Sequence, residues 1–84
     1  MSVISKFYGM TIKVFMSGYY KDTPRIYVLY GDYVGVIEIN TAVMIEGDLP
    51  ETGLQLVQEW IQENQHALDK MWETQHVIAI PPLE

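Results

Sequence analysis

Residues 25–40 read Arg-Ile-Tyr-Val-Leu-Tyr-Gly-Asp-Tyr-Val-Gly-Val-Ile-Glu-Ile-Asn, and this stretch decides the fold. The β-branched and aromatic residues on either side of Gly31 and Asp32 predict two strands, over 25–30 and 33–40, because such side chains suit a pleated, half-buried surface. A Gly-Asp pair accepts the positive φ angles of a tight turn, so the two strands are expected to form a hairpin.

Residues 10–16 and 43–46 predict two further strands beside this hairpin. In the first of these segments apolar residues alternate with others, as in a half-buried strand. The connections are short, which favours an antiparallel meander. Residues 4–7, which precede Gly9, are expected to form either a separate short strand or a bend.

The pattern becomes helical over residues 47–75. At its start Asp48 is expected to cap a helix, with Pro50 in the first turn and Glu51 completing a capping box. Asn64 interrupts the apolar stripe that follows and predicts a break into two helices. We expect the two tryptophans of the stripe to anchor the helices on the sheet. Spacings of three, four and seven place on one helix face Leu54, Val57, Trp60, Ile61, Leu68, Met71 and Trp72.

An apolar run over residues 77–80 ends the pattern and can rejoin the sheet as a short C-terminal strand before two prolines stop it. With 84 residues there is room for one domain. Its parts are a strand half (1–46), a helical half (47–75) and a C-terminal strand or tail (76–84). The predicted fold is therefore α+β, a mainly antiparallel four- or five-stranded sheet with two amphipathic helices packed on one face.

Composition excludes several classes of function. The chain has no cysteine, which removes disulfides, thiolate metal sites and thiol nucleophiles, and favours a reducing cytoplasm. No apolar run approaches the roughly 20 residues that span a bilayer, and the N-terminus lacks the long apolar stretch of a signal peptide. We therefore expect a cytoplasmic protein without a membrane partner.

The net charge of −6 is unevenly distributed. Residues 1–25 carry four basic groups and one acid, whereas residues 26–84 carry Lys70 against ten acids. Phosphate backbones bind through lysine and arginine, so nucleic acid is a disfavoured partner, confined to the basic first quarter. The acidic remainder is either a solvated face or one pole of a molecule that docks a partner, or itself, head to tail.

No specific catalytic or metal motif is present. His66 and His76 are ten residues apart and do not form a helical metal pair. No nucleophile elbow and no glycine-rich phosphate loop occurs, so neither a metal nor a cofactor is expected. Carboxylates at i, i+4 spacing repel slightly and are typical of a solvated helix face. These pairs are Glu59 with Glu63 and Asp69 with Glu73.

Seven short motifs, in order along nearly the whole chain, resemble a family of small bacterial proteins named domain of unknown function 4160. The resemblance lies in the ordered set rather than in any single motif. They are Ile4-Ser5-Lys6-Phe7-Tyr8-Gly9, Tyr30-Gly31-Asp32-Tyr33, Val36-Ile37-Glu38-Ile39, Ile45-Glu46-Gly47, Leu49-Pro50, Leu56-Val57-Gln58-Glu59-Trp60 and Trp72-Glu73.

The family carries a histidine-rich stretch, Asn-x-Pro-Pro-His-Phe-His-Ala, at the start of its second strand, and this chain departs from it. Pro24 is kept, but Arg25 and Tyr27 stand at the two histidine positions. Arginine neither binds metal nor transfers protons at neutral pH, so the resemblance implies that any histidine-based activity is lost here. The family has no established biochemical function. Its members resemble components of bacterial two-gene, toxin–antitoxin-like arrangements.

The first function hypothesis is a non-enzymatic protein-interaction module that forms a homodimer or binds a small partner protein. Two adjacent tyrosines in a turn are hard to bury together, and tyrosine and arginine are typical interface anchors. The expected contact residues are therefore Tyr19, Tyr20, Lys21, Arg25 and Tyr27.

The alternative hypothesis is a small hydrolase or nuclease-like toxin that uses the strand face. Its candidate catalytic residues are Lys13, Arg25, Tyr27 and Glu38, because the first three can converge across paired strands with a carboxylate nearby.

Overall fold

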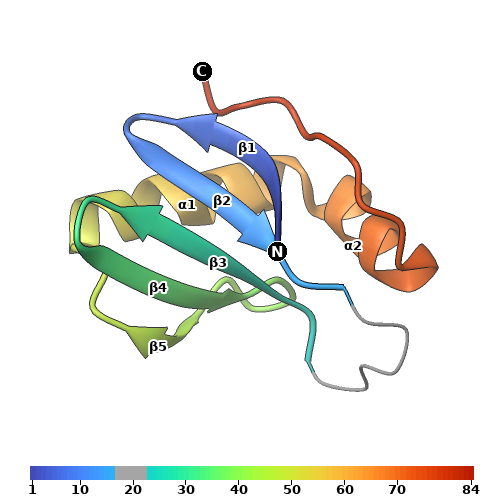
Figure 1. The fold of residues 1–84 in the computed structure, drawn as a ribbon, viewed down its shortest axis with the longest axis horizontal. Coiled ribbons are helices and arrows are strands. Elements are labelled where there is room, and N and C mark those ends of the chain that lie inside the picture. Colours follow the sequence, from blue (N-terminus) through green and yellow to red (C-terminus); the bar gives the residue numbers. More distant parts are fainter. Residues whose placement is uncertain (17–22) are drawn as a thin grey trace.

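The structure is a computed structural model that describes residues 1–16 and 23–84 (Figure 1). The strands in these residues form one antiparallel sheet whose spatial order follows the chain. The predicted α+β fold is confirmed, with five strands followed by two helices in the described part of the chain. The elements are β1 (Ser2–Phe7), β2 (Met10–Val14), β3 (Arg25–Tyr30), β4 (Tyr33–Glu38), β5 (Met44–Gly47), α1 (Glu51–Glu63) and α2 (Gln65–Thr74).

Tight turns with positive φ angles join the strands of two hairpins, β1–β2 and β3–β4. Gly31 has φ 58° between β3 and β4, where Tyr30 pairs with Tyr33, so the central hairpin is confirmed. Tyr8 (φ 49°) and Gly9 (φ 79°) form the turn between β1 and β2. Residues 4–7 therefore belong to a separate strand rather than a bend.

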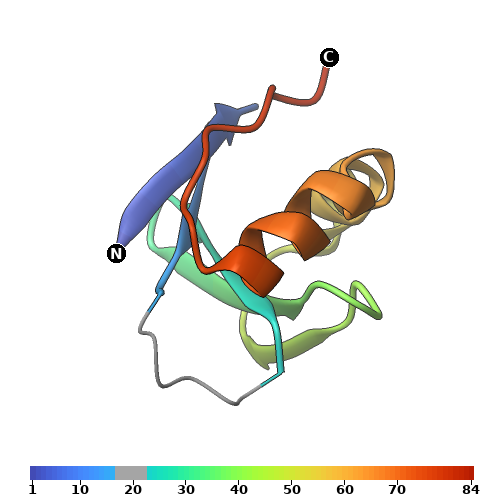
Figure 2. The same ribbon diagram turned by 90° about the vertical axis from the view of Figure 1, so that its right-hand side faces the viewer.

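Both helices cover the same face of the sheet (Figure 2). Alternate strand residues such as Ile12, Val28 and Ile37 are fully buried between the two layers. Trp60 is the largest fully buried side chain, and its ring centre lies 5.5 Å from that of Phe7 in β1. The expected anchoring role of Trp60 is thus confirmed. Trp72 is only partly buried and packs at the margin of the core.

Asn64 separates the two helices, as its place in the apolar stripe predicts. Its side-chain amide donates a hydrogen bond of 2.9 Å to the carbonyl of Trp60. Its φ of −120° is not helical, so the chain changes direction there and starts α2.

The predicted cap of α1 is wrong. Pro50 is the N-cap residue, and no side chain caps the helix. Asp48 instead exchanges two bonds with Val34 in β4: its N–H donates to the carbonyl (2.9 Å), and its carboxylate accepts from the N–H (3.2 Å). Asp48 therefore prolongs the β4–β5 pairing and faces the strand rather than the helix.

Residues 76–84 form a tail, not a sixth strand. One backbone hydrogen bond of 2.8 Å, from Ile80 N–H to Ile4 C=O, ties this tail to β1. The Trp60 indole N–H donates to the carbonyl of Pro81 (2.9 Å), and Ile80 is 4% exposed. Prolines have no N–H, so the chain cannot continue a ladder along β1 beyond Ile80. In the described part of the chain, no helix is long and apolar enough to cross a membrane.

Candidate functional site on the open face of the sheet

The face of the sheet that points away from the helices is the candidate site, and we call it the open face (Figure 2). Strand residues alternate between the two faces, so the partners of the buried set lie here. The open face consists of Val3 and Lys6 from β1, Thr11 and Lys13 from β2, Arg25, Tyr27 and Leu29 from β3, Val34, Val36 and Glu38 from β4, and Glu46 from β5.

The strand register brings together the four residues of the catalytic hypothesis. Lys13 pairs with Tyr27 across β2 and β3, and Arg25 pairs with Glu38 across β3 and β4. Arg25 and Tyr27 are two residues apart on β3 and so share a face. Directly opposite Cβ atoms lie about 4.5–5.5 Å apart, so the four side chains are neighbours on one surface.

Of the five predicted contact residues, the structure places two on this surface. Arg25 and Tyr27 lie on the open face, both partly buried. Tyr19, Tyr20 and Lys21 lie outside the described residues.

Local hydrogen bonds hold the charged pair at one end of the open face. The Arg25 Nε donates to the carbonyl of Thr23 (3.2 Å), and the Thr41 hydroxyl donates to the carboxylate of Glu38 (3.0 Å). The same hydroxyl accepts from the backbone N–H of Val43 (3.3 Å). The loop between β4 and β5 thus positions Glu38.

Charge is segregated across the open face. Among the described residues of this face, the basic groups lie on β1 (Lys6), β2 (Lys13) and β3 (Arg25), while the acidic groups lie on β4 (Glu38) and β5 (Glu46). Sequence reasoning missed Lys6 and Glu46. The sequence pattern alone does not predict which face Glu46 lies on, because the pairing of β4 with β5 shifts register between residues 36 and 37.

An apolar band lies between these charges. Tyr27 and Leu29 are half-buried, and Val36 is covered by its neighbours, whereas Val34 is 43% exposed. At the β1 margin Val3 is 46% exposed. Large exposed apolar side chains gathered on one face, with charges around them, are the usual sign of an interaction surface.

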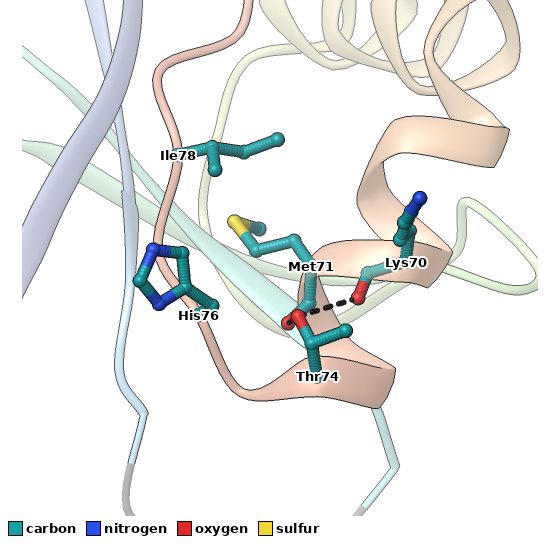
Figure 3. Close-up of a pocket in the computed structure, with 5 residues that line it drawn as sticks. All are labelled: Lys70, Met71, Thr74, His76 and Ile78. Carbon is teal, nitrogen blue, oxygen red and sulfur yellow. Dashed lines mark hydrogen bonds between the residues drawn. The ribbon is translucent and has the colours of Figure 1, made fainter.

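A separate cavity of about 310 Å³ lies between the end of α2 and the tail (Figure 3). The His76 ring faces Met71 and Ile78 there, and the Thr74 hydroxyl donates to the carbonyl of Lys70 (2.9 Å). No carboxylate and no second histidine lines this cavity among the described residues. Within residues 1–16 and 23–84 no cluster of three or more potential metal ligands occurs.

Residues 1–16 and 23–84 thus form a small domain with one antiparallel sheet, one helical layer and one open face. Residues 9–73 match the family described as Domain of unknown function (DUF4160), and the chain belongs to that family. The match runs from the turn before β2 to the last turn of α2. Neither the comparison with curated proteins nor the comparison with solved structures gave a match.

Proposed function

We propose that this protein is a non-enzymatic interaction module that binds a second copy of itself through the open face. The observation that carries the proposal is the self-complementary pattern of that face, with basic residues to one side of an apolar band and acidic residues to the other. A two-fold dimer needs such a pattern, because the same patch must bind itself.

One two-fold axis brings the basic residues of each copy over the acidic residues of the other. The axis lies midway between two facing sheets and runs parallel to the strands, between β3 and β4. It places β2 of one copy over β5 of the other, and β3 over β4. Lys13 then meets Glu46 of the partner subunit, and Arg25 meets Glu38 of the partner subunit.

The same axis aligns the apolar band. Tyr27 lies over Val36 of the partner subunit, and Leu29 over Val34 of the partner subunit. Facing sheets pack about 10 Å apart with their strands rotated by about 30°, so the match is closest near the axis. The band supplies buried apolar area, and the charges set orientation and exclude other registers.

Light scattering across a concentration series tests the proposal, with a charge exchange as the decisive arm. We expect dimers of the wild type, and a large shift towards monomer for Lys13→Glu and for Glu46→Lys. The double variant K13E/E46K should dimerise again, because the opposite charges meet once more. Glu59→Lys makes the same charge change as Glu46→Lys, but at an exposed side chain of α1, and should leave the dimer intact.

A strictly monomeric wild type at all concentrations would refute self-association. A stable complex of that monomer with a different small protein would support the other form of module, in which the open face binds a heterologous partner.

The second candidate function is the small hydrolase or nuclease-like toxin. The observation that favours it is the grouping of Lys13, Arg25, Tyr27 and Glu38 as neighbours on one surface. Expression in a bacterial host, compared with the Arg25→Ala, Tyr27→Phe double variant, tests it. A toxin should inhibit growth only as the wild type, and equal growth of both strains would count against it.

A further inference from the structure

A second surface lies at the end of the sheet where the β1–β2 and β3–β4 turns approach the start of α1 (left in Figure 1). Three tyrosines are exposed there: Tyr8 (57%), Tyr33 (44%) and Tyr30 (38%). Together with Pro50 and Leu56 of the α1 region they line a groove of about 380 Å³, which we call the tyrosine groove. Tyr30 pairs with Met10, a core residue, so this groove is on the helix side and separate from the open face.

The turns hold the three rings in place. Tyr30 and Tyr33 pair across the β3–β4 turn, with ring centres 6.3 Å apart and planes inclined by 25°. Tyr8 has φ 49°, a left-handed conformation that a bulky residue seldom adopts. Gly9 has φ 79°, and a Cβ atom added there would be in ordinary van der Waals contact with the Tyr30 ring (3.4 Å), so this ring packs against the β1–β2 turn. The aromatic surface is therefore largely pre-formed.

The groove is acidic at its margin. Asp32 lies in the turn between Tyr30 and Tyr33, and Glu51 directly follows Pro50; both acids are exposed. No lysine or arginine lines the groove among the described residues. Charge complementarity therefore favours an occupant that carries positive charge.

We propose that the tyrosine groove binds an extended, proline-containing peptide segment with a basic residue. Aromatic-lined grooves bind polyproline helices because the ligand is already stiff and loses little entropy, and its exposed carbonyls accept from tyrosine and tryptophan. The chain makes this kind of contact internally, where the Trp60 indole donates to the carbonyl of Pro81 beside Pro82. A volume near the lower limit of about 300–1,000 Å³ for ligand sites suits a few side chains rather than a folded partner.

The probe is an acetylated, amidated peptide, Arg-Pro-Pro-Leu-Pro-Pro, titrated into the ¹⁵N-labelled protein and followed by NMR. We expect saturable shifts of the amides of Tyr8, Tyr30, Tyr33 and Thr52. Two control peptides carry glutamate in place of arginine, or alanine in place of the prolines. Each should bind with an affinity at least about 10-fold lower.

Two variants remove rings without disturbing the backbone. Tyr33→Thr keeps a β-forming residue, and Tyr8→Asn keeps one that tolerates positive φ. Each should weaken peptide binding by about 10-fold or more, while Tyr27→Thr on the open face should leave it unchanged. The amide spectra of the free variants report whether each one is folded.

Absence of saturable shifts at millimolar peptide would overturn the proposal, as would equal binding of the control peptides. The groove and the proposed dimer are separable, because Lys13→Glu should break the dimer yet retain the peptide affinity. Loss of peptide binding in that variant, or shifts centred on Tyr27, would place the peptide on the open face and refute the groove.

Discussion

Gly47 shows how strongly one residue constrains this fold. It lies at the end of β5 with φ 106°, a conformation that side-chain-bearing residues rarely adopt. A Cβ atom there would meet the backbone of Val34 and lie 2.9 Å from the Cα of Gly35. Neither contact can be relieved by a side-chain rotation, so β4 and β5 would have to separate. The reciprocal bonds of Asp48 with Val34 depend on the same close approach.

We therefore predict that Gly47→Ala lowers the free energy of unfolding by more than about 2 kcal/mol. Urea denaturation measures the change. Gly31→Asn is the matched control, because Gly31 also has positive φ (58°) but nothing lies within 4 Å of its added Cβ. Asparagine tolerates this region, so the control should change stability by less than about 1 kcal/mol. Equal losses in both variants would contradict the role assigned to the Val34 contact.

The tail shows the same dependence on packing at the scale of an element. It has no ladder of its own, and its order depends on a few contacts with β1 and α1. Ile80 is 4% exposed and donates to Ile4, whereas Ile78, two residues earlier, is 41% exposed. The tail also covers part of the β1 edge, which would otherwise offer unpaired backbone groups.

We therefore predict that Ile80→Ala costs about 2–4 kcal/mol of unfolding free energy, the usual loss for a buried isoleucine. Ile78→Ala, the same truncation on the exposed part of the tail, should cost less than about 1 kcal/mol, because half-exposed side chains bury little area. Urea denaturation of both variants checks the difference. Similar values would mean that the tail is not held by its buried side chain.

The opposed charges of the open face matter at the scale of the whole molecule. Among the described residues one helical layer covers one sheet face, and on the other face Val34 of the apolar band is 43% exposed. In the proposed dimer the second copy supplies the missing layer. Val34 lies on β4, beside the proposed axis, whereas the apolar Ile78 lies in the tail, outside the open face.

We predict that Val34→Asp weakens self-association by about 100-fold or more, since a charge would be buried without a partner. Ile78→Asp introduces the same charge at a side chain that is 41% exposed, against 43% for Val34, and should leave the dimer unchanged. Sedimentation equilibrium gives both dissociation constants. Equal effects of the two variants would point to net charge rather than to the open face.

Much of the fold follows from local patterns. The period-two segments, the Gly31 turn and the break at Asn64 are all visible in the chain, because each depends on neighbouring residues. The cap at Asp48 was predicted wrongly for the opposite reason: a long-range pairing with Val34 outcompeted the local capping geometry. The sequence also suggests four candidate catalytic residues, and the strand register places them on one face: Lys13, Arg25, Tyr27 and Glu38.

The sequence by itself determined the strand half, the helical half, the family and the placement of Trp60 in the core, because apolar periodicity and burial are tightly linked. Only the tertiary structure decided that Lys6 and Glu46 join the open face from opposite margins, that three tyrosines meet at one groove, and that the tail docks without forming a strand. These features depend on register shifts and on which turns lie side by side, and such relations between distant residues have no local signature in the chain.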